Sequence, residues 1–75
     1  MQKRSLTIAG HRTSLALEPE FWAALADIAG ARSSSLAALV ADIDRARGER
    51  NLASACRLAV LDYLRNRSAK LQPAG

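Results

Sequence analysis

The sequence has few of the residues that build disulfides, metal centres or membrane spans. It contains one cysteine, Cys56, so an intrachain disulfide cannot form. With one histidine, His11, a single chain also lacks the ligands of a closed zinc site, and we predict neither a metal nor a cofactor. No apolar run approaches the ~18 residues of a membrane-spanning helix, and the start of the chain is too polar for a signal peptide. These features predict a cytoplasmic protein that does not bind membranes.

Patterns of catalytic residues are also missing. The sequence has no glycine-rich phosphate loop, and its serines, single histidine and aspartates form no set with credible catalytic roles. Asp42 and Asp44 are two positions apart in a predicted helix, so their carboxylates point in different directions. We therefore predict that the chain is not an enzyme and has no catalytic residues.

Acidic residues are absent up to Leu17, whereas the whole chain carries a net charge of +4. All seven acids lie from Glu18 onward. A basic N-terminal segment suits a polyanion such as DNA, although a solvated surface would have the same composition. Lys3 and Arg4 could reach phosphates that flank a binding site, or could lie in a disordered tail.

The segment His11–Leu17 alternates with the period of a β-strand. One face would carry Thr13, Leu15 and Leu17, and the other would carry Arg12, Ser14 and Ala16. No comparable strand follows downstream, so we expect a second copy of the chain to supply the partner strand. Residues 1–10 are a basic arm, a short strand that folds back, or a flexible tail, and the pattern leaves these alternatives open. A two-stranded ribbon has the dimensions to enter a DNA major groove.

Three helices are predicted after the strand, at about 19–29, 36–47 and 52–66. Glu18 is the expected N-cap of the first helix, with Pro19 at its first position. Ser35 and Asn51 are the expected N-caps of the other two. Residues 11–66 would form the domain and residues 67–75 a flexible tail. The third helix is apolar over much of its circumference and is expected to touch more than one neighbour.

Length predicts that the chain associates with a second copy. A domain near 75 residues buries only ~60% of its unfolded surface, and without disulfides or metals oligomerisation is the remaining source of stability. We predict a homodimer with an apolar core. The residues assigned to that core are Leu15, Leu17, Phe21, Trp22, Leu25, Ile28, Leu36, Leu39, Val40 and Ile43.

The order of these elements resembles a ribbon-helix-helix protein, and in particular a small bacterial ribbon-helix-helix subfamily of poorly described function. The resemblance extends to about Tyr63 and is carried by Lys3–Ser5, Ala9–Ser14, Leu17–Trp22, Ser35–Leu36, Leu39–Asp44 and Asn51–Ala55. Proteins of this MetJ/Arc-type superfamily form intertwined homodimers. The resemblance implies a mostly α-helical fold with one N-terminal strand, which forms an intermolecular, two-stranded antiparallel ribbon. The third helix is an addition to the minimal fold.

The resemblance also implies a binding site. Outward-facing side chains of the strand, here Arg12, Ser14 and Ala16, would contact bases. The N-terminus of the second helix, here with Ser34 and Ser35 and with Arg32 nearby, would hold a phosphate. The chain departs from the family pattern in two places, because Ser33 stands where the link often has glycine and because Ala16 leaves two polar side chains per strand to read bases.

Two functions follow as expectations. The first is a sequence-specific DNA-binding transcriptional regulator, expected to be a repressor, whose partners are double-stranded DNA and a second copy of the chain. The alternative is a protein-interaction module, such as an antitoxin or an adaptor, that uses the third helix to bind a protein partner. An apolar patch left exposed on that helix would favour the second function.

Overall fold

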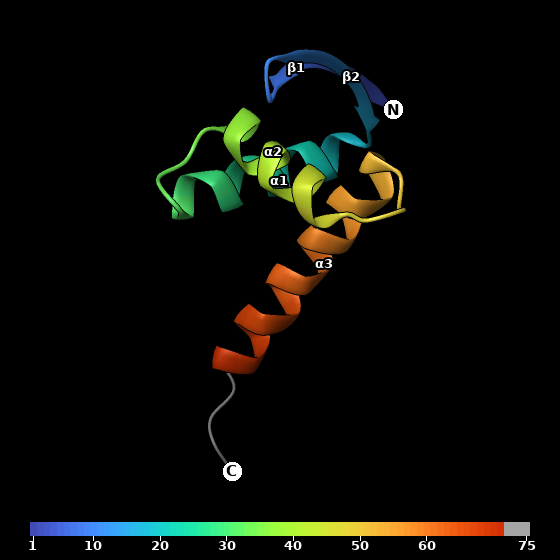
Figure 1. The fold of residues 1–75 in the computed structure, drawn as a ribbon. Helices are drawn as coiled ribbons and strands as arrows, with labels where there is room; N and C mark the ends of the chain where they lie inside the picture. The colour runs from blue at the N-terminus through green and yellow to red at the C-terminus, as the bar shows by residue number, and fades with distance from the viewer. Residues whose placement is uncertain (72–75) are drawn as a thin grey trace.

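The computed structural model describes the backbone of residues 1–71 and the side chains of residues 1–67. A β-hairpin is followed by three helices (Figure 1): β1 (Gln2–Ile8), β2 (His11–Leu17), α1 (Pro19–Ala31), α2 (Leu36–Ala46) and α3 (Leu52–Leu71). The hairpin lies at one end of the molecule, α1 and α2 lie beneath it, and α3 extends away at the opposite end. This order of strands and helices confirms the fold class predicted from the sequence.

β1 and β2 form a two-stranded antiparallel ribbon within one chain. Its register runs from Gln2 opposite Leu17 to Ile8 opposite His11. The segment before Gly10 is therefore the strand that folds back, one of the three alternatives that the sequence left open. This pairing corrects the expectation that a second copy supplies the partner strand, because β1 of the same chain fills that position. The structure holds a single chain, so the homodimer stays a prediction.

A two-residue turn joins the strands of the ribbon. Ala9 and Gly10 both have positive φ angles, 52° and 82° respectively. Positive φ at both central positions is the requirement of the type I′ turn, whose twist matches that of the flanking strands. Glycine accepts this conformation readily, whereas alanine adopts it at a cost in conformational energy.

α1 ends two residues beyond the expected Ala29, in a turn that the sequence analysis did not foresee. Ser33 has a φ angle of 53°, the left-handed conformation that commonly ends helices. The amide of Ser34 donates to the carbonyl of Ala29 at 2.8 Å, and the amide of Ser33 donates to the carbonyl of Gly30 at 3.1 Å. These two bonds define a Schellman motif. Ser33, which stands where the family pattern often has glycine, thus takes the left-handed conformation that glycine adopts readily.

α2 and α3 begin at the residues that the sequence indicates. Ser35 Oγ accepts a hydrogen bond from the amide of Ala38 at 3.0 Å, and Asn51 Oδ1 accepts one from the amide of Ser54 at 2.8 Å. α2 ends at Ala46. α3 continues to Leu71 and so includes part of the segment expected to be a flexible tail; residues 72–75 of that segment lie outside the described residues.

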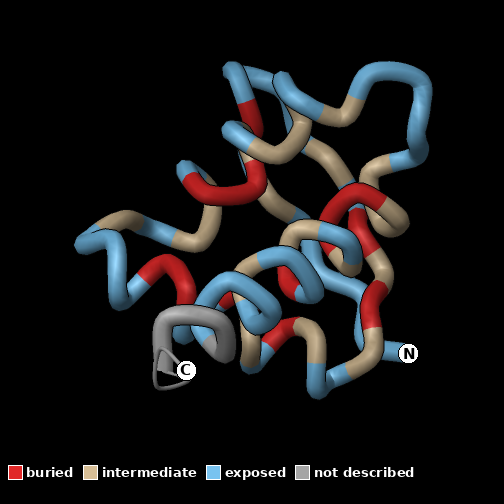
Figure 2. The backbone as a smooth tube through the Cα atoms, turned by 90° about the horizontal axis from the view of Figure 1, so that it is seen from below, coloured by how far each residue is buried: buried red, intermediate tan, exposed pale blue. Residues whose placement is uncertain are grey.

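The core lies between the inner face of the ribbon and the three helices. Leu17, Trp22, Leu25 and Val40 are at most 1% exposed within the single chain. Figure 2 shows the buried stretches on the parts of the strands and helices that face the middle of the molecule. Of the ten residues assigned to a dimer core, seven are buried, and the other three, Phe21, Leu36 and Ile43, are partly buried against that core. One chain therefore assembles this core without a second copy.

Ile8, Ala29, Cys56 and Val60 complete the core. Burial raises the pKa of the Cys56 thiol to about 11, so the group stays protonated at neutral pH. Within the described part of the chain, His, Cys, Asp and Glu side chains do not gather in the groups of three or more that a metal ion would need. Among these residues no single helix is long and apolar enough to cross a membrane; α1 and α2 meet that test of length and composition only jointly, as a pair bent by 100°.

Candidate nucleic-acid interface

The ribbon presents one polar face to solvent. Directly opposite residues of an antiparallel pair share a face, so the register groups three residues of β1 with three of β2. This outer face consists of Lys3, Ser5, Thr7, Arg12, Ser14 and Ala16. All six are exposed except Ala16, which is half-buried, and none contributes to the core. The side chains are therefore free to contact a ligand.

The opposite face of the ribbon is apolar and packs against the helices. Ile8, Leu15 and Leu17 are buried there, and Leu6 is partly buried. Because the strand period is two residues, burial of this set directs the outer face away from the body of the protein. The orientation of the candidate interface thus follows from hydrophobic packing.

The sequence predicts base contacts for three outer-face residues, Arg12, Ser14 and Ala16 of β2. It does not mark Ser5 and Thr7 of β1. β1 is less regular than β2, since only Leu6 and Ile8 mark its apolar face. Those two residues, followed by the turn-forming Gly10, were the available signal for a hairpin. In the structure β1 supplies half of the outer face, where Ser5 lies opposite Ser14 and Thr7 lies opposite Arg12.

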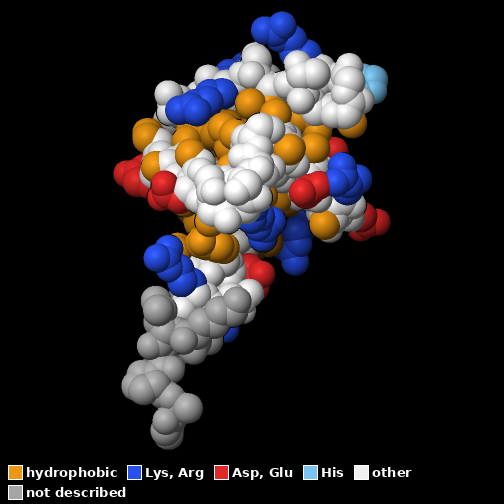
Figure 3. All heavy atoms as spheres, turned by 90° about the vertical axis from the view of Figure 1, so that its left-hand side faces the viewer, with side chains coloured by type: hydrophobic (Ala, Val, Ile, Leu, Met, Phe, Trp, Pro, Cys, Tyr) orange, Lys and Arg blue, Asp and Glu red, His pale blue; other side chains and the backbone are white. Residues whose placement is uncertain are grey.

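The ribbon carries basic side chains and no acidic ones. Lys3 and Arg12 lie on the outer face, on different strands, and the chain has no acidic residue before Glu18. Figure 3 shows basic side chains at the ribbon end of the molecule and both basic and acidic side chains on the helices beneath it. Because acidic side chains occur only beyond the ribbon, a polyanion meets no like charge on the ribbon itself.

Arg4, expected from sequence to contact phosphate, lies on the inner face of the ribbon. Its guanidinium carbon is 4.9 Å from the centroid of the Trp22 ring, a cation–π arrangement. Nε1 of the same tryptophan donates a hydrogen bond of 2.8 Å to the carbonyl oxygen of Gln2. Arg4 and Trp22 therefore join the N-terminal end of β1 to α1, which positions the ribbon.

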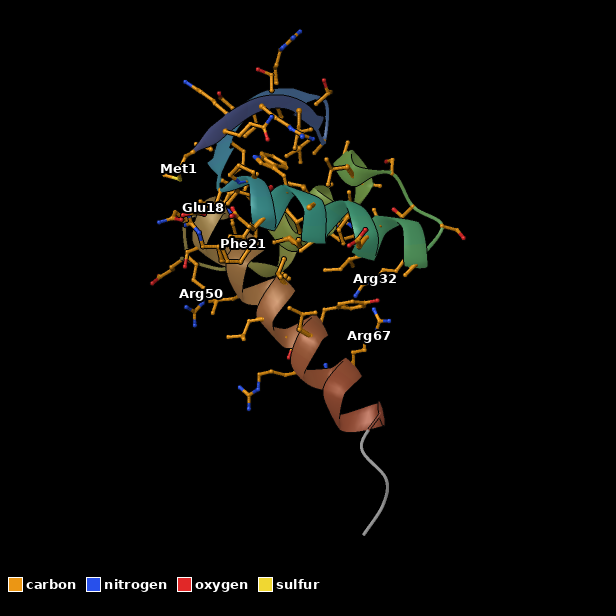
Figure 4. The ribbon with its side chains drawn as sticks, turned by 180° about the vertical axis from the view of Figure 1, so that it is seen from behind. Met1, Glu18, Phe21, Arg32, Arg50 and Arg67 are labelled. Carbon is orange, nitrogen blue, oxygen red and sulfur yellow. The ribbon has the colours of Figure 1, made fainter. Side chains whose placement is uncertain are left out.

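A second contact joins the ribbon, α1 and α3. Arg57 donates to Glu18 Oε1 from Nε at 3.0 Å and from Nη2 at 2.8 Å. Its guanidinium also lies 5.6 Å from the Phe21 ring and donates to the sulfur of Met1 at 3.4 Å. The hydrogen bonds from Arg57 lower the pKa of Glu18. Figure 4 shows Met1, Glu18 and Phe21 together at the start of α1. Sequence analysis expected Glu18 only as a helix cap, but its side chain makes no cap hydrogen bond.

The two serines expected to hold phosphate lie at the N-terminus of α2, a helix that packs against β1. Ser35 Oγ caps the helix by accepting from Ala38, and Ser34 Oγ donates to the carbonyl of Ser35 at 3.2 Å. First-turn amides of a helix have no intrahelical acceptor and attract anions. The third expected residue, Arg32, instead lines a hollow between α1 and α3, where its side chain approaches Arg67 (Figure 4).

Comparison with known proteins identifies the family. A family model described as a ribbon-helix-helix domain matches residues 1–64. The chain belongs to the ribbon-helix-helix domain family. The match spans the ribbon, α1, α2 and the first part of α3, and it confirms the resemblance seen in the sequence. Searches of curated proteins and of solved structures gave no match.

Ribbon-helix-helix domains are generally found in DNA-binding transcription regulators or in antitoxins, and they usually bind DNA as dimers. They are typically not enzymes. In this ribbon-helix-helix protein the outer face of the ribbon is exposed, carries Lys3 and Arg12, and has no acidic side chain.

Proposed function

We propose that this protein is a sequence-specific transcriptional regulator, acting as a repressor, that inserts the outer face of its ribbon into the DNA major groove. The observation that supports this most directly is the exposed, basic outer face, which the core does not use. A major groove about 12 Å wide admits a two-stranded ribbon. Membership of a family that generally binds DNA supports the same function.

Base recognition would come from both strands. The guanidinium of Arg12 can donate two parallel hydrogen bonds to O6 and N7 of guanine, the commonest specific contact in protein–DNA complexes. The hydroxyls of Ser5, Thr7 and Ser14 can donate to or accept from base edges, and the methyl of Ala16 can contact the methyl of thymine. The intrachain ribbon thus offers five side chains for base contacts, compared with three from β2 alone.

Phosphate contacts would position the ribbon in the groove. Lys3 lies at the end of the outer face remote from the turn and can reach a flanking phosphate. The N-terminus of α2, at Ser34 and Ser35, offers backbone amides to a second phosphate. Such contacts raise affinity for all sequences alike, whereas the base contacts decide which sequence is bound.

We further propose that the protein binds DNA as a homodimer. The family usually does so, and one hairpin of two seven-residue strands covers little of an operator. Within the described residues, three leucines of α3 are 40–50% exposed: Leu58, Leu61 and Leu64. An exposed apolar surface of this kind is suited to packing against the same helix of a second copy of the chain. The same leucines support the alternative function, an antitoxin or adaptor that binds a protein partner through α3.

A mobility-shift experiment tests the DNA proposal. The purified protein is titrated onto DNA from immediately upstream of its own gene and onto a scrambled fragment, at about 50 and 150 mM salt. We expect the native fragment alone to stay bound at the higher salt. Equal binding to both fragments that disappears at the higher salt would reject sequence recognition and would favour the protein-interaction function.

Substitutions on the ribbon then separate base reading from charge. Arg12→Ala is expected to cost about 1–3 kcal/mol on the best site and to relax base choice at one position. Lys3→Ala should weaken binding to all sequences equally. It should also reduce the slope of log K against log salt concentration by about one, the value for one phosphate contact. Arg65→Ala, which removes the same charge from exposed α3, is the control and should leave base preference unchanged. An Arg12→Ala protein with wild-type affinity for its best site would contradict base reading by the outer face.

A further inference from the structure

A hollow of about 450 Å³ lies between the C-terminal end of α1 and the middle of α3. It is lined by Arg32, Ala59, Asp62, Tyr63, Asn66 and Arg67. Its volume is within the range of about 300–1,000 Å³ typical of small-molecule sites. In Figure 4, Arg32 and Arg67 lie well away from the ribbon, so this α1–α3 hollow is separate from the proposed DNA interface.

Two guanidinium groups from different elements converge on the α1–α3 hollow. Arg32 follows the last residue of α1, and Arg67 belongs to α3. Among the residues whose side chains the structure describes, neither arginine forms an ion pair. Three carboxylates pair with other arginines, namely Glu18 with Arg57, Asp42 with Arg45, and Asp44 with Arg47. The lining thus carries two cationic side chains against one carboxylate, Asp62, which pairs with neither arginine among the described side chains.

One common role for such an arginine is already filled by the backbone. A basic side chain after a helix often binds the terminal carbonyl groups. Here the amide of Arg32 donates to the carbonyls of Ile28 and Ala29, the amide of Ser33 donates to that of Gly30, and the amide of Ser34 donates to that of Ala29. The guanidinium of Arg32 is therefore not needed to cap α1, and its side chain is exposed rather than part of the core.

The lining of the hollow defines the kind of molecule it would accept. A guanidinium presents a planar fork of N–H donors that matches a carboxylate or a phosphate group bidentately. Tyr63 is half-buried and supplies an aromatic side chain to the lining of the hollow. Asp62 accepts a weak hydrogen bond of 3.4 Å from Asn66 and retains lone pairs for a hydroxyl or amino group of a ligand.

We propose that the α1–α3 hollow binds a small organic anion, a carboxylate or phosphate that also carries a hydrogen-bond donor. Arg32 and Arg67 would hold the anionic group, and Asp62 would accept from the donor. Because the hollow and the ribbon lie apart, the site can be occupied whether or not DNA is bound. This inference does not rest on the proposed DNA function.

Isothermal titration of the full chain tests the site. Citrate, which carries carboxylates and a hydroxyl, and inorganic phosphate are titrated separately, with sodium chloride at matched ionic strength as the reference. We expect saturable binding of at least one anion, with a Kd at least tenfold weaker in Arg32→Gln and in Arg67→Gln. Arg65→Gln, which removes an exposed positive charge from the same helix outside the hollow, should bind like the wild type.

Comparison of the two titrants identifies whether carboxylate or phosphate chemistry is preferred. Arg32→Lys keeps the charge without the planar fork, so it should bind more weakly than the wild type and more tightly than Arg32→Gln. Circular dichroism of each variant checks that the fold is kept. Binding of neither anion beyond the sodium chloride reference would overturn the proposal, as would an equal loss of affinity in Arg65→Gln.

Discussion

Three arginines show that the neighbours of a side chain decide its role. Arg12 lies exposed on the outer face of the ribbon, Arg4 lies against Trp22 on the inner face, and Arg57 binds Glu18. All three carry the same charge, but only Arg12 is directed away from the core elements. The number of basic residues near the N-terminus therefore overstates the number available to DNA.

The pair formed by Glu18 and Arg57 predicts a dependence of stability on pH. Arg57 lowers the pKa of Glu18 in the folded protein. As the pH falls, this carboxylate is therefore protonated at a higher pH in the unfolded chain than in the folded one. The stabilisation is thus complete above the ordinary pKa of 4.5 and is lost as the pH falls through the lower folded value. We expect the free energy of unfolding to fall less steeply below pH 4.5 in Glu18→Gln than in the wild type, as measured by urea denaturation.

Glu49→Gln is the matched control, because Glu49 is exposed and forms no ion pair among the described residues. This variant should keep the acid dependence of the wild type. If Glu18→Gln and Glu49→Gln lose stability with the same pH profile as the wild type, the pair has no energetic role.

The ribbon depends on its turn as well as on its strands. A two-residue connection aligns β1 and β2 in one register and so places Lys3, Ser5 and Thr7 opposite Ala16, Ser14 and Arg12 of β2. The turn uses positive φ at both positions, yet one of them is Ala9. Local conformational preference and the demand of the hairpin therefore conflict at this residue.

Replacing Ala9 should reveal that conflict. Asparagine tolerates the left-handed conformation and is favoured before glycine in type I′ turns. We expect Ala9→Asn to raise the free energy of unfolding by about 0.5–1 kcal/mol in urea denaturation. Ala9→Val, with a β-branched side chain that disfavours positive φ, should lower it. Equal stability of the two variants would show that the turn does not have this conformation in solution.

At the scale of the whole molecule, one chain buries a continuous core from the ribbon, α1, α2 and α3. Trp22 and Leu25 from α1, Val40 from α2 and Cys56 from α3 are almost fully buried, and the described residues include no buried polar or charged side chain. The length of the chain predicted a dimer for this core, but β1 and α3 contribute to it within one chain. A homodimer would therefore bury further surface outside a core that one chain already forms.

Removal of a core side chain should consequently destabilise the protein strongly. Leu25 is 0% exposed, and leucine-to-alanine changes at such sites cost about 2–5 kcal/mol. A domain of this size has a total stability near the lower end of about 5–15 kcal/mol, so Leu25→Ala should be largely unfolded at 37 °C by circular dichroism. Leu64→Ala, at a half-exposed position, should lose less than about 1 kcal/mol. Similar losses at both positions would contradict the core described here.

Periodicity and capping residues were enough to predict the helices and the polar side of β2. Ser35 and Asn51 cap helices because a side-chain oxygen satisfies amides within its own turn, which is a local interaction. The alternation of His11–Leu17 similarly separates Arg12 and Ser14 from the buried leucines. Each of these predictions needed only neighbours within about one turn or one strand.

Contacts between distant segments were not predictable in this way. β1 was ambiguous because a short, half-apolar segment becomes a strand only when a partner is adjacent. The contact of Arg57 with Glu18 and the convergence of Arg32 with Arg67 join α3 to the two residues that flank α1, and no local pattern marks them. The end of α1 was missed because a serine takes the left-handed conformation that is usually sought at glycine.

The sequence by itself determined the types and order of β2 and the three helices, the polar face of β2 and the positive charge of the N-terminal segment, because each follows from composition or from spacing along the chain. Tertiary structure alone decided that β1 completes the ribbon within one chain and that its outer face includes Ser5 and Thr7. It also decided that Arg12 is exposed on the outer face, whereas Arg4 lies against Trp22 and Arg57 binds Glu18. The physical reason is that strand pairing, burial and ion pairing depend on which residues the folded chain brings together.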